Sequence, residues 1–122
     1  MQVKSRQRVA DHGEVFTAER EVKAMLNLLP NEIWQKINSK FLEPACGNGN
    51  FLAEILARKL DMILQMLQSK KIKKIHWQFN YEYYAIQSIS SIYGIEILPD
   101  NCLECRERLL NLFIEQALSK KF

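Results

Sequence analysis

The chain has 122 residues, enough for one small domain, and 48% of them are hydrophobic while 25% are charged. This balance excludes an intrinsically disordered chain and allows a packed core. The net charge of +3 is compatible with a nucleic-acid partner but does not require one.

The N-terminal third is predicted to form a polar arm and two short helices. Residues 1–15 are polar without a steady period and are expected to be an arm. Between residues 16 and 29, apolar side chains recur at helical spacing on one face, with Thr17 as the N-cap. Pro30 ends this helix or starts the next one, which reaches residue 38. The two apolar faces comprise Val22, Met25, Leu26 and Leu29, and then Ile33, Trp34 and Ile37.

Two short strands alternate with longer helices in the rest of the chain. A strand over residues 40–43 is followed by a long helix over residues 51–68. A second helix is expected over 82–92, a second strand over 93–98 and a final helix over 99–118. Strands that alternate with helices favour a parallel sheet. The inward-facing residues are expected to be Leu52, Ile55, Leu56, Leu60, Ile63 and Leu67 in the first of these helices, and Leu103, Leu110 and Phe113 in the last.

The stretch FLEPACGNGNF, residues 41–51, holds two of the four glycines of the chain, directly after the first strand. Glycines permit positive φ and let a ligand approach the backbone closely. A strand that ends in such a turn and leads into a helix places backbone amides at the carboxyl edge of the sheet, where small ligands bind. A dinucleotide fingerprint would have a third glycine where Leu52 stands, and no Gly-Lys-Ser/Thr is present. The segment Gly47-Asn48-Gly49 alone predicts either a ligand loop or a structural turn.

Glu96 is the only charged residue in the second strand candidate, residues 93–98. A carboxylate at the end of a parallel strand is unfavourable to bury unless a partner satisfies it, and two ribose hydroxyls would do so. The alternative is an exposed glutamate on an edge strand. Together, Glu43, the glycine loop and Glu96 predict a pocket for a ligand that has a ribose and an amino-acid end.

Three segments resemble adenine-specific DNA methyltransferases of restriction–modification systems, in the order of that family. FLEPACGNGNFL (41–52) resembles the S-adenosylmethionine-binding signature, and DHGEVFT (11–17) resembles the segment before it. SIYGIEILPDNCLECRERLL (91–110) is similar to the next block, and Ala18 departs from the pattern because the family has proline there. The resemblance covers nearly the whole chain. It implies an α/β chain with part of a Rossmann-like methyltransferase fold, in which two parallel strands have flanking helices and the later strands are missing.

The resemblance also implies a domain division and a cofactor site. Residues 1–122 would be one partial methyltransferase domain, with the arm at 1–15, helices at 16–38 and the first half of the cofactor-binding fold at 39–122. Glu43 would match the ammonium group of the cofactor and Glu96 would hold the ribose hydroxyls. The residues implied to bind S-adenosylmethionine are Phe16, Thr17, Glu43, Pro44, Ala45, Cys46, Gly47, Gly49, Asn50, Phe51, Glu96 and Ile97.

The catalytic signature of the family, Asn/Asp-Pro-Pro-Tyr/Phe, is absent, because Pro30, Pro44 and Pro99 stand apart. We therefore assign no catalytic residue and expect a truncated or split enzyme that is inactive alone, binds the cofactor weakly and contacts DNA only as part of the complete enzyme. The alternative is a non-catalytic interaction or regulatory module that pairs with a separate methyltransferase chain. The free edges of a two-stranded sheet also favour a homodimer.

Two further motifs allow a structural or a functional interpretation. Cys102 and Cys105 have the spacing of a zinc knuckle, but a closed site needs four ligands and the other candidates are scattered, so we expect no metal. The run KKIKKIHWQF, residues 70–79, interleaves lysines with apolar and aromatic residues. We favour a solvated connection with its aromatic residues turned to the core, and the alternative is a nucleic-acid contact with steep salt dependence.

The sequence also predicts a compartment. No apolar run is long enough to span a bilayer, and the first residues are polar and do not resemble a signal peptide. The three cysteines are an odd number for a disulfide framework. We expect a cytoplasmic protein with reduced thiols and no membrane partner.

Overall fold

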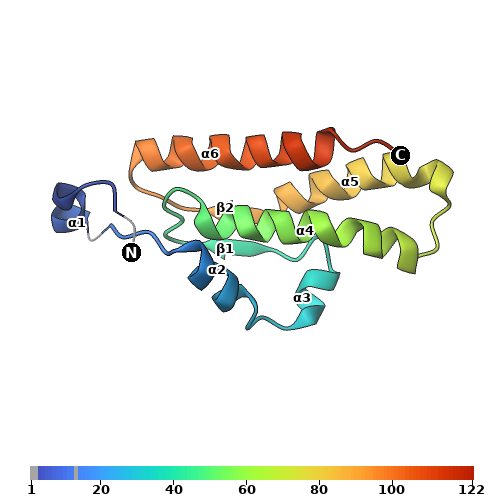
Figure 1. Ribbon diagram of the computed structural model, residues 1–122, viewed down its shortest axis with the longest axis horizontal. Coiled ribbons are helices and arrows are strands. Elements are labelled where there is room, and N and C mark those ends of the chain that lie inside the picture. The colour runs from blue at the N-terminus through green and yellow to red at the C-terminus, as the bar shows by residue number, and fades with distance from the viewer. Residues whose placement is uncertain (1–2, 13) are drawn as a thin grey trace.

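The computed structural model describes residues 3–12 and 14–122 and shows a mixed α/β chain that is mostly helical (Figure 1). None of the helices in these described ranges is both long enough and apolar enough to cross a membrane. A 3-10 turn covers Lys74–His76, and a π-helical turn covers Ile114–Leu118. In chain order the other elements are α1 (Arg6–His12), α2 (Glu19–Leu26), α3 (Asn31–Gln35), β1 (Phe41–Glu43), α4 (Asn50–Ser69), α5 (Trp77–Ser90), β2 (Ile92–Gly94) and α6 (Pro99–Phe113).

The predicted α/β class with two parallel strands is confirmed. Strands β1 and β2 are neighbours in one sheet, and the chain between them passes through α4 and α5. Pairing continues beyond the strands, because Ile95 donates its backbone N–H to the carbonyl of Glu43 (3.0 Å) and Cys46 donates to the carbonyl of Ile95 (3.0 Å). The carboxyl ends of both strands therefore lie at the same edge. The register pairs Phe41 with Ile92, Leu42 with Tyr93 and Glu43 with Gly94.

The second strand is shorter than predicted, and this changes the position of Glu96. Strand β2 covers Ile92–Gly94 instead of residues 93–98. Its partner β1 ends before Pro44, which has no N–H to donate, so the ladder stops soon after. Glu96 therefore lies two residues beyond β2, in the turn that leads to α6.

Helix α4 forms the centre of the core. It packs against α2, α3, α5, α6 and β2, and Figure 1 shows it running along the middle of the molecule. Two clusters of buried side chains meet on it, one towards α5 and the end of α6, the other towards α2 and the start of α6. The predicted inward stripe is confirmed, since each of its side chains is at most 4% exposed. The stripe consists of Leu52, Ile55, Leu56, Leu60, Ile63 and Leu67.

Two other predicted apolar faces are partly wrong. On α6, Leu103 and Leu110 are exposed, and the buried positions near the start of the helix are Asn101 and Cys105 instead. These two residues are one turn apart, so they share a face of the helix. Because their side chains are small or polar, the hydrophobic spacing of the sequence does not identify this face as buried. On α2, Met25 is exposed, although the spacing predicts that it faces the core.

The N-terminal arm also differs from the prediction. It contains the short helix α1, whose Arg8 forms an ion pair with Asp100 at the start of α6. Thr17 does not cap α2, because Ala18 occupies the N-cap position and no side chain caps the helix. Instead, the backbone carbonyl of Thr17 accepts a hydrogen bond from the side-chain amide of Asn50 (2.8 Å).

Helix α5 starts earlier than predicted, at Trp77 instead of residue 82. Trp77 donates its indole N–H to the carbonyl of Ile72 (2.8 Å), and both side chains pack against the core. Ile75 and Phe79, from the same basic run, are exposed. The favoured interpretation, with the aromatic side chains turned to the core, therefore holds for Trp77 and not for Phe79.

One face of the sheet is covered by helices and the other is open. Ile92 contacts both core clusters, and Gly94 lies against Leu52 of α4. Leu42 and Tyr93, which pair in the register, point to the opposite face and are 63% and 49% exposed. Parallel sheets usually bury both faces. The open face is therefore a surface on which apolar groups remain in contact with water.

A buried lysine, which the sequence pattern did not reveal, joins α4 to the segment before β1. Lys59 is fully buried, and its Nζ donates hydrogen bonds to the backbone carbonyls of Ile37 (2.6 Å) and Ser39 (2.7 Å). The ammonium also lies 5.1 Å from the centroid of the Phe41 ring. Burial lowers the pKa of Lys59 to about 8.

This shift predicts a pH-dependent contribution to stability. Between about pH 8 and 10.5 the unfolded chain holds a proton on Lys59 that the folded chain has lost, so stability rises with pH across this window. We expect the free energy of unfolding of wild type, relative to Lys59→Met, to increase by about 2–3 kcal/mol across it. Urea unfolding at several pH values measures this difference. Subtracting the variant removes the titrations of tyrosines and thiols, which both proteins share.

Two further observations complete this test. Lys59→Met leaves two buried carbonyls without a donor and should lose about 1–3 kcal/mol below pH 8. Lys36→Met, at an exposed lysine, is the matched control and should follow wild type. Equal pH slopes for wild type and Lys59→Met would contradict the assignment.

Candidate functional site

The loop between β1 and α4 depends on two glycines with positive φ. Gly47 has φ +55° and Gly49 has φ +94°, a region that other residues rarely adopt. The amide of Gly49 donates to the carbonyl of Cys46 (2.9 Å), which closes a tight turn directly before α4. The loop thus brings the N-terminus of α4 to the carboxyl edge of the sheet.

The two glycines have different surroundings. A Cβ at Gly47 would lie 3.2 Å from the ring of Phe16, whereas a Cβ at Gly49 would lie only 2.8 Å from Cys105 Sγ on α6. Gly49 is buried behind the loop and does not line the cleft described below. In this structure Gly49 allows α6 to pack close to the loop, and its assignment to the cofactor site stays a prediction.

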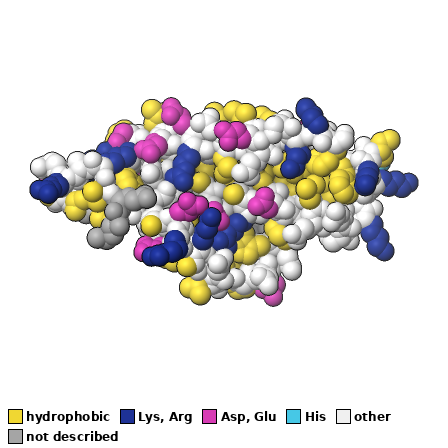
Figure 2. Space-filling model, viewed as in Figure 1, with side chains coloured by type: hydrophobic (Ala, Val, Ile, Leu, Met, Phe, Trp, Pro, Cys, Tyr) yellow, Lys and Arg dark blue, Asp and Glu magenta, His cyan; other side chains and the backbone are white. Residues whose placement is uncertain are grey.

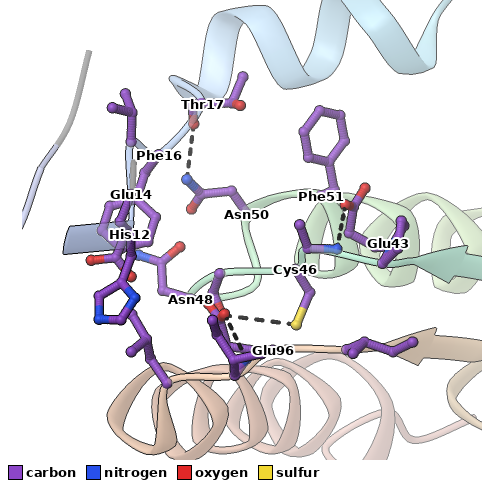
Figure 3. A pocket seen from close by; sticks show the side chains of 17 residues that line it. His12, Glu14, Phe16, Thr17, Glu43, Cys46, Asn48, Asn50, Phe51 and Glu96 are labelled. Atoms are coloured by element: carbon purple, nitrogen blue, oxygen red, sulfur yellow. Dashed lines mark hydrogen bonds between the residues drawn. The ribbon is translucent and has the colours of Figure 1, made fainter. Parts of the chain in front are cut away.

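A cleft of about 440 Å³ lies at the carboxyl ends of both strands. Figure 3 shows the side chains around it, which come from the N-terminal segment, the glycine loop and the turn after β2. Of the twelve residues predicted to bind a ligand, the structure brings eleven together here and leaves out Gly49. Those eleven are Phe16, Thr17, Glu43, Pro44, Ala45, Cys46, Gly47, Asn50, Phe51, Glu96 and Ile97.

Sequence reasoning missed six residues that also line the cleft. Most of them flank predicted positions, and Asn48 lies between the two glycines of the loop. The sequence could have indicated them, because each lies inside one of the three motif segments. Segment 11–17 contains the N-terminal positions, 41–52 contains the loop position and 91–110 contains the other two. The missed residues are His12, Glu14, Val15, Asn48, Ile95 and Leu98.

Two carboxylates in the cleft are held by neutral donors. Glu43 Oε1 accepts the backbone N–H of Ala45 (3.1 Å). Glu96 Oε1 accepts the N–H of Ile97 (2.9 Å), and its Oε2 accepts the side-chain amide of Asn101 (3.0 Å). Within the described part of the chain, neither carboxylate forms an ion pair. The cleft therefore presents oriented negative charge to a ligand that carries a cation or hydroxyl groups.

Ion pairs fix the N-terminal segment against the start of α6. Arg8 Nε lies 2.8 Å from Glu14 Oε1, and its guanidinium also binds Asp100, with one contact at 3.1 Å. Hydrogen bonds from Arg8 hold the pKa of Asp100 well below its usual range. Lys4 contributes an ion pair to Glu104 at 2.8 Å. The network positions Phe16, which is 8% exposed, over the glycine loop.

The glycine loop also offers hydrogen-bonding groups that the protein leaves unused. Among the described residues, the backbone N–H groups of Gly47 and Asn48 have no acceptor. The side-chain oxygen of Asn48 is buried and likewise has no donor, although its Nδ2 reaches Glu104 (3.4 Å). Free amides beside a helix N-terminus favour a carboxylate or another anion. A ligand with an amino-acid end therefore fits this site. Its ammonium group would meet the acidic side chains, and its carboxylate would meet the free amides.

The cysteines are placed for packing, not for nucleophilic chemistry. Burial raises the pKa of the Cys46 thiol to about 12 and also raises that of Cys105. Cys102 Sγ donates to the backbone carbonyl of Glu96 (3.2 Å). In the residues that the structure describes, no group of three or more His, Cys, Asp or Glu side chains is arranged to hold a metal ion. A thiol with a raised pKa stays protonated, so it is a poor nucleophile.

Comparisons of the chain with family profiles, curated proteins and solved structures gave no match. The interpretation of the cleft therefore rests on its own geometry and on the order of the sequence motifs. That geometry combines three acids, free backbone amides, aromatic side chains and two exposed isoleucines. Such a set can bind and orient a small polar ligand.

The contact between Gly49 and α6 gives a prediction about stability. Gly49→Ala should destabilise the chain by about 2–4 kcal/mol, because it adds a steric overlap to an unfavourable φ. Cys105→Ala removes the overlapping sulfur, so the double variant should lose at least ~1 kcal/mol less than the sum of the single variants. Denaturant unfolding of the four proteins measures this coupling. Strictly additive losses would show that the sulfur does not limit the loop.

Proposed function

We propose that the chain is the S-adenosylmethionine-binding part of an adenine-specific DNA methyltransferase, with a partial Rossmann-like methyltransferase fold. The observation that carries the proposal is the convergence of Glu43, Gly47 and Glu96 on one cleft, from two segments that each resemble a motif of that family. Ligands of open α/β sheets bind at this edge of the strands.

The residues of the cleft divide between the two ends of the cofactor. Glu43 would accept the ammonium group, and the free amides of Gly47 and Asn48 would bind the carboxylate. Glu96, already oriented by Asn101, would accept hydrogen bonds from the two ribose hydroxyls. Ile97 would pack against the adenine. When bound, the cofactor supplies an electrophilic methyl group on its sulfonium.

The chain alone is expected to bind this cofactor weakly. Ile97 is 76% exposed, so the structure provides only one side of the adenine site. A missing apolar wall of ~2–3 kcal/mol weakens the dissociation constant by roughly 30- to 150-fold relative to a complete pocket. The chain is also expected to transfer no methyl group alone, because the sequence has no Asn/Asp-Pro-Pro-Tyr/Phe segment to hold a flipped adenine.

Titration with S-adenosylmethionine, followed by amide NMR, tests the proposal. The resonances of Gly47 and Asn48 should shift, with saturation above the low-micromolar range. Glu96→Gln should weaken binding by about 10-fold or more, because it removes a charge-assisted acceptor. Glu107→Gln, at an exposed glutamate of α6 outside the cleft, is the matched control. A titration without shifts in the loop, or equal effects of both variants, would refute the proposal.

The open sheet face favours a second candidate function, a non-catalytic module that pairs with another chain. Leu42 and Tyr93 are exposed there, and an apolar groove of about 230 Å³ lies between α2 and β1. Two-stranded sheets need further packing to be stable. A second chain, or a second copy, that covers this face would provide it.

Sedimentation and co-purification test this second candidate. We expect the wild-type chain to dimerise at micromolar concentration, or to co-purify with a chain that carries the Asn/Asp-Pro-Pro-Tyr/Phe segment. Leu42→Asp should abolish the association, whereas Leu103→Asp, at an exposed leucine of α6, should not. A monomeric wild-type chain without such a partner, or association that survives Leu42→Asp, would rule the candidate out.

A further inference from the structure

Six lysines from two distant segments gather at one end of the molecule. Four lie in the turn between α4 and α5, and two follow the π-helical turn near the C-terminus. Gln78 joins the segments, because its Nε2 donates to the carbonyl of Lys120 (3.0 Å) and its Oε1 accepts the N–H of Phe122 (3.0 Å). Figure 1 shows the C-terminus beside the first turns of α5. The basic end consists of Lys70, Lys71, Lys73, Lys74, Lys120 and Lys121.

The charge of this basic end is not balanced by acids. Residues 62–81 and 116–122 contain no Asp or Glu, and Figure 2 shows Lys and Arg side chains without acidic neighbours there. Among the described residues none of the six lysines forms an ion pair, whereas Lys4, Arg8 and Arg58 all do. The chain has 17 Lys and Arg, so 11 remain outside the basic end against 14 Asp and Glu. The net positive charge of the chain is thus located at this end, because the rest of the chain has more acidic than basic residues.

Lys71 occupies a backbone position that favours glycine. Its φ is +55°, and it follows α4 in a Schellman motif, in which Ile72 donates to the carbonyl of Leu67 (3.1 Å) and Lys71 to that of Gln68 (3.0 Å). Glycine would adopt this φ without steric strain. A lysine at this position is a local conflict that stability does not explain, and such conflicts are expected at functional sites.

We propose that the basic end binds the sugar–phosphate backbone of duplex DNA. Lysine ammonium groups contact phosphates as point charges, so the contact would position the duplex without reading its sequence. Helix α4 has 20 residues and separates the cleft from the basic end by about 30 Å, or roughly 9 base pairs. The choice of DNA among polyanions rests on the proposed function.

An anionic membrane is the main competing partner, and the packing argues against it. Membrane surfaces favour Trp and Tyr at the interface. Here the rings of Trp77 and Tyr81 pack against Phe122, with centroid distances of 5.8 and 5.5 Å. Among the described residues of the basic end, Ile75, Phe79 and Phe122 remain exposed, and the Phe122 ring is held by its contacts with Trp77 and Tyr81.

Fluorescence anisotropy with a labelled duplex of about 25 base pairs, over a range of salt concentrations and without cofactor, tests the proposal. Wild type should bind with a dissociation constant of about 10⁻⁴–10⁻⁶ M, and six phosphate contacts give a log–log salt slope of about −5. Replacing Lys71, Lys73, Lys74 and Lys121 by Gln should weaken binding at least 10-fold and reduce the slope by about 3–4. The matched control replaces four exposed basic residues elsewhere, Arg20, Lys36, Lys40 and Arg106, and should change affinity less than 3-fold.

A single substitution separates binding from folding. Lys71→Gly removes one contact and relieves the backbone conflict, so the salt slope should fall by about 0.9 while the melting temperature rises by roughly 3–6 °C. Equal losses in the quadruple variant and its control, or tighter binding to phosphatidylserine vesicles than to the duplex, would overturn the proposal. The duplex assay contains no cofactor, so a failed cofactor titration does not change its result. Failure of the cofactor titration and failure of DNA binding are therefore distinguishable.

Discussion

The parallel pairing of two three-residue strands determines where the candidate site lies. Because β1 and β2 run in the same direction and end together, the glycine loop and the turn that carries Glu96 meet at one edge. Such short strands have little stability of their own. Their position depends on α4, which packs against β2 with its apolar stripe and anchors the segment before β1 through Lys59. The cleft is thus a consequence of core packing as much as of its own residues.

Regular periodicity and backbone chemistry made much of this arrangement predictable. The apolar stripe of α4 identified the central helix, and the position of the glycines after an apolar run identified the loop. Parallel strands with ends at one edge then brought Glu43 and Glu96 into the same prediction. The buried residues that the sequence pattern did not predict have physical explanations. Asn101 and Cys105 face the core although neither is strongly apolar, and Lys59 is buried because two backbone carbonyls satisfy it.

Contacts between segments that are distant in the chain could not be predicted from sequence patterns. The N-terminal arm has no regular period, yet Arg8 fixes it to the first turn of α6 and so makes Glu14 part of the cleft wall. Likewise, Gln78 brings the C-terminal lysines to the lysine turn. In both cases polar side chains make the connection, and their partners lie more than 40 residues away along the chain. Hydrophobic spacing carries no information about such pairs.

The two tryptophans lie in different halves of the molecule, so the fluorescence of each one reports on its own half. Trp34 stacks on Phe41 of β1 (5.3 Å) with the guanidinium of Arg58 at 5.4 Å, while Trp77 meets the edge of Phe122 (5.8 Å) beside the C-terminus. Since the chain has only these two indoles, removing either one leaves a single tryptophan, whose emission lies at longer wavelength than that of the four tyrosines. Trp34 would report on the half that contains the strands, and Trp77 would report on the end near the C-terminus. Local unfolding of either part could therefore be followed by fluorescence without an attached dye.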